Sequence, residues 1–128
     1  MVEGYVPTES EEQQLVFEWA AFMELSDQRL KLLYHTPNGG VRPRATAARL
    51  KLEGVRAGVP DICLPVPDKG YHGLYIEMKK RDRSNHPTRE QMNWIEMLSD
   101  QGYRATVCYG ADEAIEEISK YLRINEEQ

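Results

Sequence analysis

The stretch VPDICLPVPDKGYHGLYIEMKK, Val59 to Lys80, contains two apolar runs that predict two strands of one sheet. The first run is DICLPV and the second is LYIEMK, and the segment PDKGYHG between them is typical of a hairpin-like connection. Asp61 opens the first run, and Glu77 stands inside the second, two residues before Lys79. Charged residues are seldom found in buried strands, so these three need a reason to be there.

Side-chain alternation groups the charges of the second run. Tyr75, Glu77 and Lys79 share one face of the strand, while Leu74, Ile76 and Met78 share the other. If the two runs pair, Asp61 comes near Glu77. Two carboxylates in a partly desolvated place repel each other unless a cation lies between them. Ligands that are all oxygen favour a hard ion, so the pattern predicts Mg²⁺ or Mn²⁺ in preference to zinc.

Each of these residues also has a simpler interpretation. Glu77 and Lys79 fit an exposed ion pair on a wet face of the sheet. Asp61 fits a turn residue that follows Pro60. The hypothesis of a metal site therefore depends on the joint pattern, which chance produces far less often than its parts.

Gln91 lies near the start of a helix predicted after Thr88. It shares a face with Ile95 and Leu98, four and seven residues further on, so its amide can point toward the core. The alternative is a capping box in which Gln91 caps its own helix together with Thr88. The residue pattern leaves both roles open.

Glu12 lies in the predicted first helix, Thr8 to about Asp27, on the apolar face that includes Leu15. It can therefore point toward the sheet. The alternative is a surface acid that the helix dipole favours, like its neighbours Glu9 and Glu11. Because a helix start read from sequence can shift by a few residues, all three acids are candidates for the inward position.

The rest of the sequence predicts the other elements of an α/β fold. These are a short strand in KLLYHT, a loop with a short helix around ATAARLKL, a helix from Thr88 to Gly102, a strand in YRATVCY, and an amphipathic helix in ADEAIEEISKYL. The predicted order is helix, three strands, helix, strand, helix. We expect one domain over residues 1–128, with its core at about residues 9–122 and a short polar tail.

Composition excludes several classes of protein. With 128 residues, 41% hydrophobic and 29% charged, the chain is typical of a globular domain and not of a disordered or fibrous protein. No signal peptide opens it, and no apolar run approaches the roughly 18 residues of a membrane span. Cys63 and Cys108 have neither zinc nor disulfide spacing. We expect a soluble, cytoplasmic protein with buried cysteines.

Charge is distributed unevenly along the chain. The net charge is -5, but residues 29–60 hold seven basic residues against one acid, and residues 79–90 hold five against two. Local basic patches on an acidic protein can still bind a polyanion. The alternative is ordinary solvated surface charge.

Taken in order, these features resemble a known family of nucleases. Pro60-Asp61 followed by Glu77-Met78-Lys79 resembles the PD-(D/E)XK motif. The segments GVRAGVPDICLPV and LYIEMKKRDRSNHPTREQMNWIEMLSDQGYRATVCYG, with EEQQLVFEW upstream, narrow the resemblance to the VRR-NUC branch, from about Glu9 to Tyr121. That resemblance implies the restriction-endonuclease-like αβββαβ core, with a central mixed sheet flanked by helices.

The resemblance also implies roles for the residues in the motif. Asp61 and Glu77 would bind Mg²⁺ or Mn²⁺, with the carbonyl of Met78, and Glu12 would complete the metal site. Lys79 would orient or deprotonate the attacking water and stabilise the transition state. Gln91 would support Lys79 or the water, and cutting would leave a 5′-phosphate and a 3′-hydroxyl.

The basic segments then become candidates for phosphate contacts, which position DNA without reading its sequence. The candidate DNA-binding residues are Asn38, Arg42, Arg44, Arg49, Arg56, Lys80, Arg81 and Arg83. His35 and His86 fit ordinary polar loop residues.

Stand-alone members of this branch resemble small phage-encoded or bacterial nucleases, and their homodimers resemble Holliday junction resolvases. We therefore expect a homodimer that cuts branched DNA, with a four-way junction as substrate. One alternative is a nuclease of the same chemistry that acts on flaps, ends or duplex. The other is a non-catalytic DNA-binding module, which would be expected to lack the acids or the lysine.

Overall fold

The computed structural model describes residues 4–37 and 43–124. Its elements, in chain order, are α1 (Glu9–Met23), the 3₁₀ helix η1 (Gln28–Leu32), β1 (Tyr34–His35), α2 (Arg44–Leu52), β2 (Ile62–Leu64), β3 (Leu74–Lys79), α3 (Arg89–Asp100), β4 (Arg104–Tyr109) and α4 (Ala111–Leu122).

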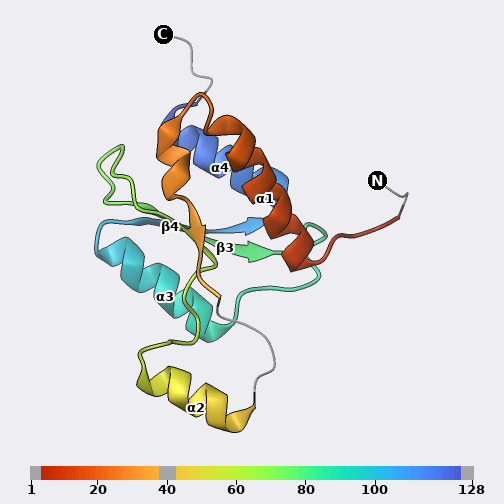
Figure 1. Cartoon of the computed structure of the whole chain (residues 1–128), viewed down its shortest axis with the longest axis vertical. Coiled ribbons are helices and arrows are strands. Elements are labelled where there is room, and N and C mark those ends of the chain that lie inside the picture. The colour runs from red at the N-terminus through yellow and green to blue at the C-terminus, as the bar shows by residue number, and fades with distance from the viewer. Residues whose placement is uncertain (1–3, 38–42, 125–128) are drawn as a thin grey trace.

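The four strands form one mixed sheet in the order β1-β2-β3-β4. β2 pairs antiparallel with both β1 and β3, whereas β3 and β4 run parallel. α1 and α4 pack together on one face of the sheet, and α3 lies on the other (Figure 1). This arrangement confirms the predicted α/β class and the mixed sheet flanked by helices.

The core lies between the sheet and the pair formed by α1 and α4. Ile76 and Met78 of β3 join Val16 of α1 and Ile118 of α4 in one buried cluster. The apolar face predicted for the second run is therefore the face that builds the core, and β3 is held rigidly at the centre of the sheet.

Two elements differ from the sequence prediction near the start of the chain. α1 ends at Met23, before the predicted end, and the strand expected in KLLYHT is reduced to two residues. The segment between them forms η1 because the Asp27 side chain accepts the N–H of Arg29, 3.1 Å away, and because Leu30 is buried in the core. Local capping and one apolar anchor outweigh strand propensity there.

α2 lies beyond α3, away from the sheet (Figure 1). It has no buried residue, so its helical form rests on local propensity and not on packing. Within residues 4–37 and 43–124, none of the helices is both long and apolar enough to span a bilayer.

Candidate active site

Asp61 and Glu77 come together because β2 and β3 pair. The register joins Ile62 to Ile76, and its continuation places Asp61 opposite Glu77. Oδ2 of Asp61 accepts the backbone N–H of Met78 at 2.8 Å. Glu77 is 1% exposed, and its Oε1 is buried with no hydrogen-bond partner among the described residues. A buried carboxylate oxygen without a partner is costly, and a bound cation would remove that cost.

Two prolines end the strand pairing beside Asp61. The register of β1 and β2 places Thr36 opposite Asp61, and the Thr36 N–H donates to the Asp61 carbonyl at 2.9 Å. The next pair along would be Pro37 and Pro60, and neither has an N–H to donate. The β1–β2 ladder therefore stops at Asp61, where a pocket opens.

Lys79 lies among acidic groups at the end of β3. Its Nζ is 3.6 Å from Oε2 of Glu77 and 3.9 Å from Oε1 of Glu9, and its side chain is only 7% exposed. Burial, and then the neighbouring Asp61 carboxylate, raise the pKa of Glu77 to about 8, although Lys79 acts in the opposite direction. Without a metal ion Glu77 therefore tends to hold a proton near neutral pH.

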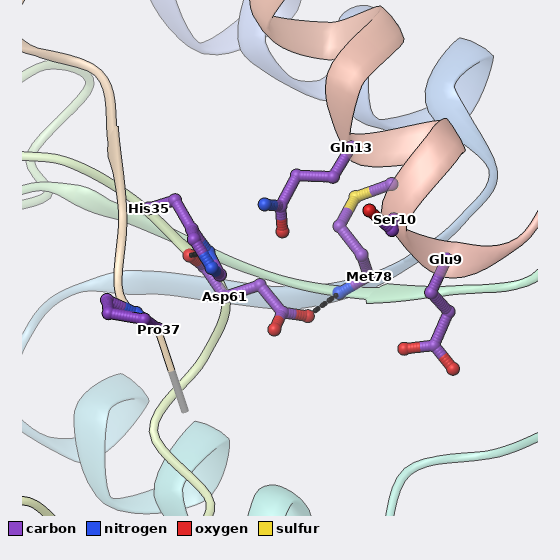
Figure 2. Close-up of a pocket in the computed structure, with 7 residues that line it drawn as sticks. All are labelled: Glu9, Ser10, Gln13, His35, Pro37, Asp61 and Met78. Carbon is purple, nitrogen blue, oxygen red and sulfur yellow. Dashed lines mark hydrogen bonds between the residues drawn. The ribbon is translucent and has the colours of Figure 1, made fainter. Parts of the chain in front are cut away.

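The pocket beside these residues has a volume of about 270 Å³. Its lining residues are Glu9, Ser10, Gln13, His35, Pro37, Asp61 and Met78. Figure 2 shows Asp61 at the centre, Glu9 and Ser10 on one side, His35 and Pro37 on the other, and Gln13 extending from α1 toward the space between them. α1, β1, β3 and the residue that precedes β2 all contribute to its wall.

Glu12 does not line this pocket, although the family resemblance implies that it completes the metal site. Its side chain is fully buried and forms two hydrogen bonds with Arg81, at 2.6 and 2.8 Å, and a third with the N–H of Ala111 at 3.0 Å. Burial alone would raise the pKa of Glu12, but the bonds from Arg81 and Ala111 outweigh it and lower the pKa. The acid of α1 that reaches the pocket is Glu9, one turn earlier.

A close approach of the backbone makes this ion pair possible. Gly110 has φ +91°, and a Cβ there would lie 2.8 Å from Cβ of Arg81 and 3.5 Å from Oε2 of Glu12. Only glycine leaves room for Arg81 to pass beside the start of α4.

Gln91 takes the capping role that the sequence left open. Its Oε1 accepts the N–H of Thr88 at 2.8 Å, and its own N–H donates to Oγ1 of Thr88 at 3.2 Å. Within the described part of the chain, no hydrogen bond joins Gln91 to Lys79. Its side-chain NH₂ group is the part that remains for a ligand.

Two candidate DNA-binding residues already have partners in the protein. Arg81 is paired with Glu12, and Arg83 lies 3.0 Å from Glu113 and stacks over the ring of Tyr109 at 4.1 Å. Both side chains tie the loop after β3 to its surroundings, which explains their position without DNA.

The other candidates fall into two groups. Arg44 and Arg49 are exposed on α2, and Arg56 is exposed just after it. Lys80 is half-buried, and its backbone N–H donates to Oδ1 of Asn85 at 3.0 Å. Asn38 and Arg42 lie outside the described residues.

An oxygen-ligated cation fits this donor set. Among the described residues, no three Asp, Glu, His or Cys side chains are placed to hold a metal by themselves. Mg²⁺ does not need such a set, because it keeps several waters and usually binds one or two carboxylates together with substrate phosphates. Asp61 and the unpartnered oxygen of Glu77 can supply those carboxylates.

The mixed sheet, with a carboxylate pair and a lysine on its central strands, defines a nuclease core of the restriction-endonuclease-like class. The family model of the VRR-NUC domain matches residues 5–112. The chain therefore belongs to the VRR-NUC family, which gives it a nuclease-type activity with DNA as substrate.

A solved structure agrees with this assignment. It is described as a VRR_NUC domain protein and is 32% identical in sequence, with a TM-score of 0.80. The match covers 95% of this chain and 93% of that chain. No curated protein matches the chain.

Three polar residues of the pocket, Ser10, Gln13 and His35, are not singled out by the sequence pattern. Ser10 follows Glu9 directly, and Gln13 lies one helical turn after it. Helical spacing would therefore have indicated both residues if Glu9 had been known to face the pocket. In the sequence His35 fits an ordinary polar residue, because only the pairing of β1 with β2 brings it to Asp61.

Proposed function

We propose that this protein is a Mg²⁺- or Mn²⁺-dependent, structure-selective DNA endonuclease, and that residues 1–128 act as one nuclease domain. The observation that supports it best is the buried pair of Asp61 and Glu77, with an unpartnered carboxylate oxygen next to Lys79. A structural sheet gains nothing from this arrangement, whereas metal-assisted phosphodiester hydrolysis uses it.

In this proposal Asp61 and Glu77 hold the ion, and the carbonyl of Met78 assists them. The N–H and C=O of one strand residue point to the same side. Since the Met78 N–H meets Asp61, its carbonyl also points toward that edge. Glu9, which lines the pocket, replaces Glu12 as the acid of α1. The bound ion would polarise the scissile phosphate and lower the pKa of water.

Lys79 would orient the attacking water and offset the negative charge that develops on the phosphate. Its Nζ lies between Glu77 and Glu9, so it is fixed at the rim of the carboxylate pair. Gln91 would offer its free NH₂ group to the same water or to a phosphate oxygen.

The cations of α2 and of the segment just after it would hold the DNA backbone at a distance from the cut. Arg44, Arg49 and Arg56 have no ion-pair partner in the described part of the chain, unlike Arg81 and Arg83. Contacts of this kind supply affinity that is sensitive to salt and independent of sequence.

We propose a four-way junction as the substrate and a homodimer as the active form, working in the cytoplasm. A two-fold dimer would present two equivalent sites, as symmetric incision of a junction requires. Each copy contributes one such pocket beside Asp61, so paired cuts would use the same pocket of a second copy.

The test is cleavage of a labelled immobile four-way junction with Mg²⁺, Mn²⁺ or EDTA, alongside flap and duplex controls. Parent protein is compared with Asp61→Asn, Lys79→Ala and the control Asp82→Asn, which changes an exposed acid. Sedimentation velocity at micromolar concentration measures the oligomeric state.

Paired, metal-dependent nicks that Asp61→Asn and Lys79→Ala abolish and Asp82→Asn preserves would support the whole proposal. Cleavage of flaps or duplex alone, or a monomer in solution, would overturn the junction substrate and leave the metal chemistry standing. Binding of junctions without cleavage would favour a non-catalytic DNA-binding module.

A further inference from the structure

Asp61 lies at the end of the β1–β2 ladder, where the strand pairing is weakest. β1 and β2 form only two residue pairs before the ladder reaches Asp61. A proline on each strand then prevents the ladder from continuing. The end of a short ladder opens readily, because few hydrogen bonds must break to release it. A carboxylate that holds a metal ion needs a backbone that does not move.

The ring of His35 provides a second bond at this point. Its Nδ1 lies 2.8 Å from the carbonyl oxygen of Asp61, which also accepts the Thr36 N–H at 2.9 Å. A carbonyl oxygen only accepts, so Nδ1 carries the hydrogen. Because Nδ1–H is present in one neutral tautomer and in the charged ring, the bond does not depend on the charge of the ring.

Figure 2 shows the ring of His35 beside Asp61 at the wall of the pocket. The backbone of Asp61 is therefore held from β1 and its carboxylate is held from β3, where it accepts the Met78 N–H. Two hydrogen bonds to the Asp61 carbonyl and one to its carboxylate therefore determine where this residue lies.

We propose that His35 is a positioning residue for the metal-binding carboxylate of Asp61, acting through Nδ1–H. This inference rests on the proposed metal site. Partners of a metal-binding residue that fix its orientation typically contribute about 10- to 100-fold to metal affinity. The edge strand β1 thus contributes a residue to the active site and does not only extend the sheet.

The test compares His35→Ala with His35→Asn. The amide nitrogen of asparagine can take the place of Nδ1 and donate to the Asp61 carbonyl, whereas alanine cannot donate. His86→Ala is the matched control, because His86 contacts Tyr109 and lies outside the pocket. Mn²⁺ affinity is measured by titration calorimetry without DNA.

We expect His35→Ala to weaken Mn²⁺ binding by about 10-fold or more, and His35→Asn and His86→Ala to remain within about 3-fold of the parent. Parent-like affinity in His35→Ala, or an equal loss in His35→Asn, would overturn the proposal.

A readout without metal separates this inference from the proposed function. The amide hydrogens of Thr36 and Met78 both bond to Asp61, so their exchange rates report how firmly Asp61 is held. His35→Ala should accelerate both by about 10-fold and leave the Gly110 N–H, bound to the Lys79 carbonyl, unchanged. Unchanged exchange at both amides overturns the inference, even if Asp61→Asn abolishes Mn²⁺ binding. Accelerated exchange in a protein that binds no Mn²⁺ at all overturns the metal site instead.

Discussion

The carboxylate of Glu12 and the guanidinium of Arg81 form a two-bond ion pair that joins α1 to the loop after β3. The carboxylate is fully buried, and the arginine side chain is 32% exposed. Glu12 also accepts the first N–H of α4, from Ala111. Three parts of the chain therefore meet at one buried charge, and Glu9 is left to face Lys79.

Substitution of these two acids should separate structure from function. Glu12→Gln should lower the free energy of unfolding by about 2–4 kcal/mol, because it leaves Arg81 without its charged partner. Glu9→Gln should lower the free energy of unfolding by at most about 1 kcal/mol, because it removes only a partly exposed ion pair with Lys79, and it should abolish metal-dependent cleavage. Urea unfolding and junction cleavage measure the two effects. Loss of Mn²⁺ binding in a fully stable Glu12→Gln protein would instead return Glu12 to the metal site.

The raised pKa of Glu77 predicts how stability depends on pH when metal is absent. The folded protein keeps a proton up to about pH 8, whereas an unfolded glutamate releases it near the ordinary pKa of 4.5. The unfolded state therefore binds fewer protons between these values, so the free energy of unfolding should fall as pH rises from about 4.5 to about 8. Urea unfolding in EDTA at several pH values measures this slope.

Glu77→Gln is the control for that slope, since an amide does not titrate. Its stability should vary less with pH than that of the parent across the same window. Added Mn²⁺ should raise the free energy of unfolding of the parent most strongly near pH 8, because metal binding displaces the proton. Parallel pH profiles for parent and Glu77→Gln would mean that another group carries the effect.

Gly58 anchors the segment that leads into β2. It has φ +90°, and a Cβ there would lie 2.9 Å from the backbone of Glu90 and 2.9 Å from Cδ1 of Trp94. The Trp94 indole N–H also donates to the Ala57 carbonyl at 3.0 Å. Gly58→Ala should therefore combine backbone strain with a clash against α3.

Gly54→Ala is the matched control, because Gly54 has φ +104° but no atom within 4 Å of its Cβ position. Backbone strain alone should lower the free energy of unfolding of Gly54→Ala by about 1–3 kcal/mol. Gly58→Ala should lose about 1–3 kcal/mol more, because of the clash with α3. Thermal or urea unfolding measures both. Equal losses would show that the contact with α3 is not tight.

The cations of α2 and of the segment just after it should affect DNA binding and not the chemical step. Combined Arg44→Ala, Arg49→Ala and Arg56→Ala should weaken junction binding, and each phosphate that is no longer neutralised should reduce the slope of log K against log salt by about 1. The rate of cleavage of bound junction should stay near that of the parent. Fluorescence anisotropy at several salt concentrations, with Lys31→Ala as a control on η1, measures the slope. An unchanged slope would mean that DNA phosphates do not contact these three arginines.

Local patterns predicted most of the elements. The capping box offered as one role of Gln91 is present at Thr88, and Thr8 forms a second one, because a cap depends on residues three apart. The alternation in LYIEMK predicted which face of β3 is apolar. The predicted strand in KLLYHT was too long, since it depends on the pairing partner that β1 finds in β2.

The sequence by itself indicated the family, the order of the main helices and strands, and the candidates Asp61, Glu77 and Lys79, because alternation along one strand and a short connection between two strands favour their meeting. Only the tertiary structure decided which acid of α1 faces the pocket, and that Glu12 pairs with a residue 69 positions away. It also decided that His35 meets Asp61. Such contacts depend on how α1 and β1 pack against the sheet, and local propensity carries no information about packing between distant segments.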